Sequence, residues 1–305
     1  MVSDYLLGGV EAGGTKFICA VGRGPDDLVS LESFPTSTPE ETLGRTAAFF
    51  RKHRRHLAAV GIGSFGPVDP NPSSDTYGYI TSTPKAGWPN TNFAGFLQRE
   101  LEVPVAFDTD VNAAALGEHR WGAARGLTTF VYLTIGTGIG GGGLVERRRM
   151  RGLVHPEMGH IRLPRAAGDD FEGACPFHGD CLEGMASGPA ILKRTGHLAE
   201  RLPEEDPAWA YEVHYLAHAL ANITCILSPE RMILGGGVMH QKHLFPRVRR
   251  ELVSILAGYI RSPEILERST SYVVPPELGD RAGVLGALAL AEEASGRSSS
   301  TSPQE

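Results

Sequence analysis

Four side chains that could bind one metal ion are concentrated in a single short segment. The four are His160, Cys175, His178 and Cys181, in the order His and then Cys-x-x-His-x-x-Cys. Two imidazoles and two thiolates suit a tetrahedral Zn²⁺ whose coordination shell is closed by the protein. A closed site of this kind is structural, so the chemistry must lie in what the metal holds in place.

Two alternatives compete with the zinc interpretation. A chance cluster is disfavoured because the chain has only 4 cysteines and two of them flank a central histidine here. A disulfide between Cys175 and Cys181 is disfavoured because nothing else indicates an oxidising compartment, and because it would leave both histidines unexplained. Zinc also gives neighbouring carboxylates a role. Glu157 and Glu183 flank the ligands and, once fixed, could bind vicinal hydroxyls of a polar substrate; the alternative is two ordinary surface glutamates.

Composition limits the class of protein. The 305 residues are enough for two domains, and 41% hydrophobic with 21% charged residues is typical of a soluble globular protein.

No apolar run could cross a bilayer and the N-terminus lacks a secretory signal, so we expect a cytoplasmic protein without a membrane partner. The net charge of −6 gives no reason to expect nucleic acid. The basic runs at 51–56 and 147–149 are interpreted as a helix end and as a hairpin tip or loop, and the tail 295–305 is expected to be disordered.

Two glycine-rich turns each connect a pair of predicted strands. The first turn, within residues 5–22, consists of Gly13, Gly14, Thr15 and Lys16. Its residue order and the strand that follows exclude a Walker A loop. The second turn, within 128–146, matches G-x-G-x-x-G, but only weakly as a dinucleotide fingerprint because no helix follows. Both turns could present backbone N–H groups to one polyphosphate; the alternative for each is an ordinary hairpin turn.

Polar side chains also gather where a predicted strand at 103–110 enters a helix. Asp108, Asp110 and Asn112 lie at this junction, and ligands bind at this end of strands in α/β folds. Several polar groups at one strand end favour a general base at Asp110 over a simple helix N-cap, which remains the alternative. Elsewhere, Trp88 is expected to be a packing residue under a loop, and Cys225, inside a long helix, a small core residue.

The order of these motifs resembles the ROK family of sugar kinases and repressors. The matching stretches, in chain order, are GGVEAGGTK, GIGSFGPVD, DTDVNAAALGE, LTIGTGIGGGG, HPEMGH with CPFHGDCLEG, LGGGV and AGVLGALALA. They cover nearly the whole chain, and the zinc segment is the most specific. The resemblance implies an α/β fold of the actin-like ATPase (ribonuclease H-like) type, with two domains and the active site in the cleft between them.

The domain limits expected from this resemblance follow the motifs. An N-terminal α/β domain would span 1–112 and be completed by the C-terminal helix 282–294. A larger C-terminal α/β domain would span 113–281 and carry the zinc loop at 155–183. We also expect a homodimer.

The resemblance assigns roles to individual residues. Asp110 would be the general base, and His160, Cys175, His178 and Cys181 would bind the structural Zn²⁺. ATP with Mg²⁺ would be bound through Glu11, Gly13, Gly14, Thr15, Lys16, Thr137, Gly138, Pro189, Gly235, Gly236 and Gly237. The hexose would contact Gly66, Thr109, Asn112, Glu157, His160 and Glu183. Glu11 would orient Mg²⁺ through water.

Three departures from the usual family pattern indicate the fructokinase branch. Glu11 replaces an aspartate, Asp108-Thr109-Asp110 replaces E-N-D, and Cys175 with His178 replaces Cys-x-Cys. We therefore expect phosphorylation of D-fructose to fructose 6-phosphate, with glucose, mannose or an N-acetylated hexosamine as alternative acceptors.

Two other classes of protein are disfavoured. A sugar-responsive repressor of the same family would carry a helix-turn-helix domain ahead of the first phosphate hairpin, which this chain reaches by Glu11. A zinc-stabilised interaction module would leave the glycine hairpins and Asp110 without a role. If zinc acts only on the sugar side, its loss should raise the sugar KM strongly and the ATP KM slightly, because the phosphate hairpins lie elsewhere in the sequence.

Asp110→Asn tests the base assignment directly. The amide keeps the shape of the side chain but cannot accept a proton, so turnover should fall by about 10²–10⁴-fold while the fold and sugar binding are retained. Steady-state kinetics and a sugar-binding titration measure the two effects. A loss of about tenfold or less would contradict the assignment.

Overall fold

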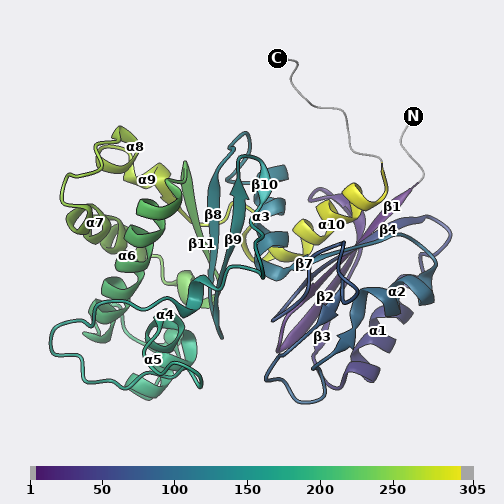
Figure 1. Cartoon of the computed structure of the whole chain (residues 1–305), viewed down its shortest axis with the longest axis horizontal. Coiled ribbons are helices and arrows are strands. Elements are labelled where there is room, and N and C mark those ends of the chain that lie inside the picture. The colour runs from purple at the N-terminus through teal and green to yellow at the C-terminus, as the bar shows by residue number, and fades with distance from the viewer. Residues whose placement is uncertain (1–4, 297–305) are drawn as a thin grey trace. The chain divides into compact units, whose positions relative to one another are not determined.

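The computed structural model describes residues 5–296, which form two compact units (Figure 1). Unit 1 contains the described residues up to Gly122, the short stretch Arg151–His155, and the described residues from Arg281 onward. Unit 2 contains Ala123–Met150 and Pro156–Asp280. The division differs from the expected one at residue 112, because the helix that begins at Asp110 stays whole in unit 1. Of the expected disordered tail, residues 297–305 lie outside the described part of the chain.

The two units contain sheets of the same topology. The sheet of unit 1 has the order β3-β2-β1-β4-β7, from β1 (Leu6–Ala12), β2 (Lys16–Gly24), β3 (Asp27–Pro35), β4 (Leu57–Ser64) and β7 (Val105–Thr109). The sheet of unit 2 has the order β10-β9-β8-β11-β12, from β8 (Phe130–Ile135), β9 (Ile139–Val145), β10 (Arg148–Arg149), β11 (Arg231–Gly235) and β12 (Val273–Val274). In each sheet three antiparallel strands are followed by two parallel ones. A small separate sheet pairs β5 (Tyr79–Ile80) with β6 (Thr91–Asn92).

Helices cover both faces of the unit 1 sheet (Figure 1). They are α1 (Pro39–Arg51), α2 (Phe93–Leu101), α3 (Asp110–Trp121) and α10 (Ala282–Ala294). Helix α1 begins with a side-chain cap, in which Thr38 Oγ1 accepts from Glu41 N at 3.4 Å. Helix α10 packs on β1, β4 and α3. A side chain at Gly286 or Gly61 would collide with the facing backbone, so these glycines allow α10 to pack closely on α3 and β4.

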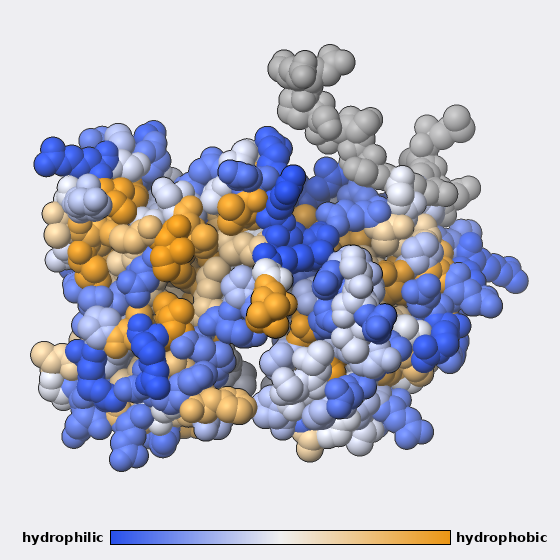
Figure 2. Space-filling view, in the orientation of Figure 1, coloured by the Kyte–Doolittle hydropathy of each residue, from blue (hydrophilic) through white to orange (hydrophobic). Residues whose placement is uncertain are grey.

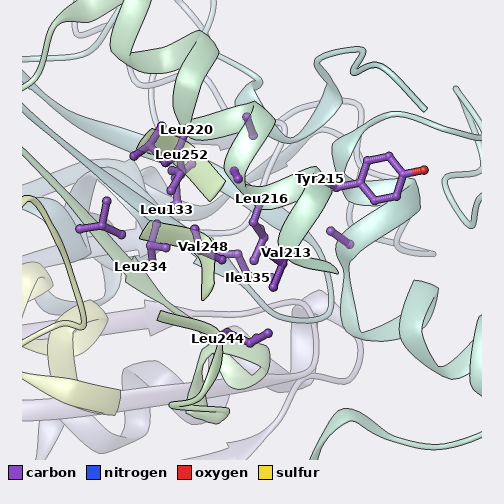
Figure 3. Close-up of a cluster of buried hydrophobic side chains, with 14 of the residues drawn as sticks. Leu133, Ile135, Val213, Tyr215, Leu216, Leu220, Leu234, Leu244, Val248 and Leu252 are labelled. Atoms are coloured by element: carbon purple, nitrogen blue, oxygen red, sulfur yellow. The ribbon is translucent and has the colours of Figure 1, made fainter. Parts of the chain in front are cut away.

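A large aliphatic core joins the unit 2 sheet to its helices. These helices are α4 (Leu182–Ala186), α5 (Gly188–Thr195), α6 (Ala208–Leu227), α7 (Leu244–Leu256), α8 (Pro263–Leu266) and α9 (Ser269–Tyr272). Figure 3 shows side chains of β8 and β11 meeting those of α6 and α7. The hydroxyl of Tyr215 points away from this cluster (Figure 3).

Two expectations about single residues have opposite outcomes. Trp88 is fully buried among aromatic side chains of unit 1, which confirms its packing role. Cys225 is exposed on α6, so its assignment to the core was wrong. Helical periodicity places it on the outer face, together with Ile226, and a helix position alone did not reveal which face is buried.

Polar side chains cover most of the face shown in Figure 2, and hydrophobic residues occur there in small groups. None of the helices within residues 5–296 combines the length and apolar character needed to cross a bilayer. Of the basic residues at 147–149, Arg147 lies at the hairpin tip, where it and Glu146 adopt positive φ, and Arg148 and Arg149 form β10.

Glu212 is an acidic residue in the core of unit 2. Its side chain projects from α6 and is almost completely buried. Burial raises the pKa of Glu212 well above its usual range, and the nearby Arg194 opposes this shift. The carboxyl group is therefore neutral in the folded protein at moderately acidic pH.

Glu212→Gln should make stability less dependent on pH. The unfolded chain ionises this group near pH about 4.3, so above that value the folded protein binds more protons and stability falls as pH rises. The variant should therefore gain Tm over the parent protein by a margin that grows from acidic to neutral pH, as measured by thermal unfolding. The exposed Glu205→Gln is the matched control. A margin that does not change with pH would contradict the prediction.

Candidate active site

The parallel strands of unit 1 bring three predicted site elements to one sheet edge. The register pairs Glu11 on β1 with Gly63 on β4, and Gly63 with Asp108 on β7. All three strands run in the same direction, so the turns that follow them leave the sheet at the same level. Neighbouring strands are about 4.8 Å apart, which places the first hairpin and the start of α3 within roughly 10 Å of each other.

The first turn of α3 is held by a side chain that precedes Asp110. The N-cap is Thr109, whose Oγ1 accepts from Asn112 N at 3.1 Å. Asp110 is therefore the first helical residue and not the cap, and its Oδ1 accepts from Val111 N at 2.8 Å. Because Thr109 Oγ1 already caps the helix, Asp110 is not needed as the cap, and the residue is partly exposed.

Thr109 and Asn112, both predicted to contact sugar, are turned into the unit. Asn112 is fully buried and its Nδ2 donates to Asp108 Oδ1 at 2.8 Å. Thr109 is 4% exposed and supplies the cap. Their hydrogen bonds support the first turn of α3, and their contacts with sugar stay a prediction.

An ion pair beneath this turn, between the exposed Arg151 and the buried Asp108, was not predicted. Asp108 is 0% exposed, and its Oδ2 accepts from Arg151 Nη2 at 2.6 Å. Its Oδ1 accepts from Thr109 N and from Asn112 Nδ2, both at 2.8 Å. Asp108 was part of the polar cluster at the strand end, but the only sequence signal for Arg151 was its place beside a basic run.

Hydrogen bonds hold the first glycine hairpin in its conformation. Gly13 N donates to Lys16 O at 2.9 Å, and Thr36 Oγ1 donates to Gly13 O at 2.7 Å. Gly14 and Thr15 at the tip are exposed, as is Lys16. A turn of this kind directs peptide N–H groups and a cationic side chain toward solvent, which suits a phosphate group. Gly66 follows β4 at the same sheet edge.

The side chain of Glu11, near the end of β1, lies next to Gly283 of α10. A Cβ at Gly283 would be 2.6 Å from Glu11 Oε2 and 2.8 Å from its Cγ. Both distances are shorter than real contacts, so the glycine leaves the space that this carboxylate occupies.

Unit 2 gathers the second set of predicted nucleotide contacts. Gly235 ends β11 opposite Thr134 of β8, so the turn at 235–237 leaves the sheet beside the turn at 136–138. Gly236 has φ of +87°, and a side chain there would collide with Ile135. Gly188 N donates to Gly136 O at 2.8 Å, which holds the start of α5, including Pro189, against the same turn. Thr137 is exposed at its tip.

Glu183 connects this turn to the zinc segment. Ile139 N donates to Glu183 Oε2 at 2.9 Å, and a Cβ at Gly138 would be 2.7 Å from the same oxygen. Glu157 is close enough to interact electrostatically: partial desolvation raises its pKa, which His160 lowers and Glu183 raises further. The second hairpin therefore lies against the zinc segment although it is elsewhere in the sequence, because sequence distance does not measure distance in a folded unit.

The four predicted metal ligands meet at one point. Their ligand atoms all lie within 4.8 Å of one another, with Nδ1 of His160 3.8 Å from Cys175 Sγ and 3.5 Å from Cys181 Sγ. Cys175 Sγ is 3.7 Å from His178 Nδ1. Usual zinc bond lengths and tetrahedral angles put sulfur and nitrogen ligands about 3.6 Å apart. The donors therefore fit a tetrahedral Zn²⁺, and Cys175 and Cys181 are not joined by a disulfide.

A polar network fixes the part of the loop that precedes Cys175. Asp169 is buried and accepts from Arg194 Nη1 at 2.6 Å and from the Tyr215 hydroxyl at 2.6 Å. Burial would raise the pKa of Asp169, but hydrogen bonds from Arg194, Tyr215 and the Phe171 backbone outweigh it and hold the pKa below its usual range. Burial, together with Asp169, raises the pKa of Tyr215 to about 12. The network ties the loop to α5 and α6.

Comparison with known proteins identifies the class. The model of the ROK family matches residues 7–294, and the chain belongs to that family. It is 44% identical to a fructokinase of Pediococcus pentosaceus over 95% of this chain and 98% of the relative. It is 47% identical to a fructokinase of Lactococcus lactis subsp. cremoris over 87% of this chain and 90% of the relative.

A solved structure extends the comparison to the fold. The ROK family glucokinase of Streptomyces griseus, in complex with glucose and AMPPNP, superposes with a TM-score of 0.76 at 26% identity. The match covers 94% of this chain and 99% of that one. The expected family and the two-domain α/β fold of the actin-like ATPase type are confirmed.

The metal cluster predicts about one zinc per chain, following the four-ligand rule for closed sites. Cys181→Ser removes a buried ligand, so the variant should lose the ion and lower the unfolding temperature. Elemental analysis and thermal unfolding measure these effects. Cys225→Ser, which replaces the exposed cysteine outside the cluster, should keep metal and stability. Equal metal content in both variants would contradict the site.

Proposed function

We propose that this chain is an ATP-dependent hexose kinase that converts D-fructose to fructose 6-phosphate. The observation that carries the proposal is the position of Asp110, a partly exposed carboxylate at the sheet edge that also bears the first glycine hairpin. The relatives named as fructokinases, at 44% and 47% identity, support fructose as the acceptor. The solved relative that holds AMPPNP, an analogue of ATP, supports ATP as the donor.

Each group has a defined task in this reaction. Asp110 accepts the proton of the C6 hydroxyl while that oxygen attacks the γ-phosphorus, and the bond to the β-phosphate oxygen breaks to release ADP. Lys16 and peptide N–H groups of the hairpins bind the phosphates. Glu157 and Glu183 bind sugar hydroxyls, and the turn at Gly235 to Gly237 binds adenosine.

Two metal ions have separate roles. Glu11 would orient Mg²⁺ through water, and the ion would supply positive charge to neutralise the transferring phosphate. His160, Cys175, His178 and Cys181 would hold Zn²⁺ with four protein ligands, so that its role would be structural. Because Glu183 accepts from Ile139 N, zinc removal should raise the KM for ATP as well as that for the sugar.

A coupled assay of ADP release across fructose, mannose, glucose and N-acetylated hexosamines tests the proposal. Fructose should give the highest kcat/KM. Turnover of another hexose with higher kcat/KM would overturn the choice of sugar. Absence of ATP-dependent turnover with every hexose, in zinc-loaded protein with a normal unfolding transition, would overturn the kinase assignment.

The contact between Gly283 and Glu11 predicts a selective defect. In Gly283→Ala the new methyl group should displace the flexible Glu11 carboxylate while leaving the backbone in place. The KM for Mg²⁺-ATP should rise about tenfold, equivalent to a lost interaction of about 1.4 kcal/mol, with little change in the sugar KM. Kinetics at varied Mg²⁺ measure the effect.

Two further variants test whether the effect passes through Glu11. Gly44→Ala is a matched helical control because nothing lies within 4 Å of its added Cβ. Shortening the displaced side chain, in Gly283→Ala with Glu11→Asp, should recover part of the loss. If the rise in KM for Mg²⁺-ATP in the double variant equals the product of the rises in the two single variants, the two residues act independently. That result would contradict the prediction.

A further inference from the structure

Arg151 begins a stretch of chain with little apolar packing of its own. Residues Arg151–His155 belong to unit 1, although the chain on both sides of them belongs to unit 2. The stretch contains neither helix nor strand, and its Leu153 and Val154 are 102% and 69% exposed. Burial of these two side chains therefore contributes little to the position of the stretch.

The contact from Arg151 reaches the most deeply buried carboxylate of the unit 1 site. Arg151 Nη2 donates to Asp108 Oδ2 at 2.6 Å, and Asp108 is 0% exposed. Removing the cation would take a charged hydrogen-bond donor from a fully buried carboxylate, which costs more than losing an ion pair between two exposed groups. The ion pair is therefore expected to fix the position of Arg151 relative to Asp108.

Each end of the pair leads to a different part of the proposed reaction. Asp108 Oδ1 binds Thr109 N and Asn112 Nδ2, and these two residues set the first turn of α3, where Asp110 is the first residue. Arg151 precedes Glu157, a predicted sugar ligand, by only six residues.

We propose that Arg151 is a positioning residue that couples the turn of the general base to the segment that delivers Glu157 to the sugar. This inference rests on the proposed kinase function. Arg151 acts through Asp108 and touches no reacting atom. The first phosphate hairpin is braced separately, by Thr36, so the coupling concerns the sugar and not ATP.

Arg151→Ala tests the coupling by comparing the effect of the substitution on the sugar kinetics with its effect on the ATP kinetics. The kcat/KM for the sugar should fall on the order of 10- to 100-fold, the size of effect that a small misplacement produces. The KM for ATP should stay within about twofold, as should zinc content. Arg148→Ala, which removes an exposed charge three residues away, should behave as the parent protein. Arg151→Lys should recover part of the loss, because the contact joins a single nitrogen to a single oxygen.

A double-mutant cycle with Asp108→Asn tests the route of the effect. If Arg151 acts through Asp108, the double variant should lose much less than the product of the two single losses. Multiplicative losses would overturn the proposal. So would an Arg151→Ala variant that matches Arg148→Ala, or one in which both KM values rise equally as the unfolding temperature falls, since that indicates a general structural role.

Hydrogen exchange separates this proposal from the kinase assignment. In Arg151→Ala, but not Arg148→Ala, exchange should become faster at residues 151–158 and at the amide of Asn112, whatever the catalytic activity. Parent protein that turns over no hexose would refute the kinase function alone. Unchanged exchange in Arg151→Ala would refute the positioning role alone.

Discussion

The register of the parallel strands is the constraint that places the predicted site residues of unit 1 and those of unit 2. In unit 1 it sets Glu11, Gly63 and Asp108 at one level, and in unit 2 it sets Gly235 beside Thr134. A slip of one residue would turn Glu11 and Asp108 to the opposite face of the sheet. The turns that bear the predicted ligands to phosphate therefore inherit their positions from hydrogen bonding within the sheets.

In unit 1 this register is held by a helix from the far end of the chain. α10 packs against β1 and β4 so closely that side chains at Gly9 and Gly61 would strike its backbone. Close approach fills the space behind the strands without a gap and limits their sliding. Gly283 of the same helix lies beside Glu11, so one packing surface supports the sheet and leaves room for the Glu11 carboxylate.

Local patterns in the sequence predicted the zinc ligands, the glycine turns and Asp110 because each depends on residues close together in the chain. The contacts that orient them were not predictable in this way. Arg151 and Asp108 are 43 residues apart, and Glu183 and Ile139 are 44 apart. Such pairs arise from tertiary packing, and a single sequence does not show which residue a charged side chain will contact. The same limitation explains Cys225, whose helix was predicted but whose buried face was not.

The support of the zinc loop from two sides indicates what the metal adds. Asp169, with Arg194 and Tyr215, already fixes the first part of the loop to two helices. The ligand Cys181 lies beyond this network, immediately before α4, and Leu182 N donates to Ile161 O at 3.0 Å. An ion bound there would restrain the start of α4 and with it Glu183, whose Oε2 accepts from Ile139 N of the second hairpin. Under the proposed function, a closed metal site would therefore affect phosphate and sugar binding only through the position of Glu183.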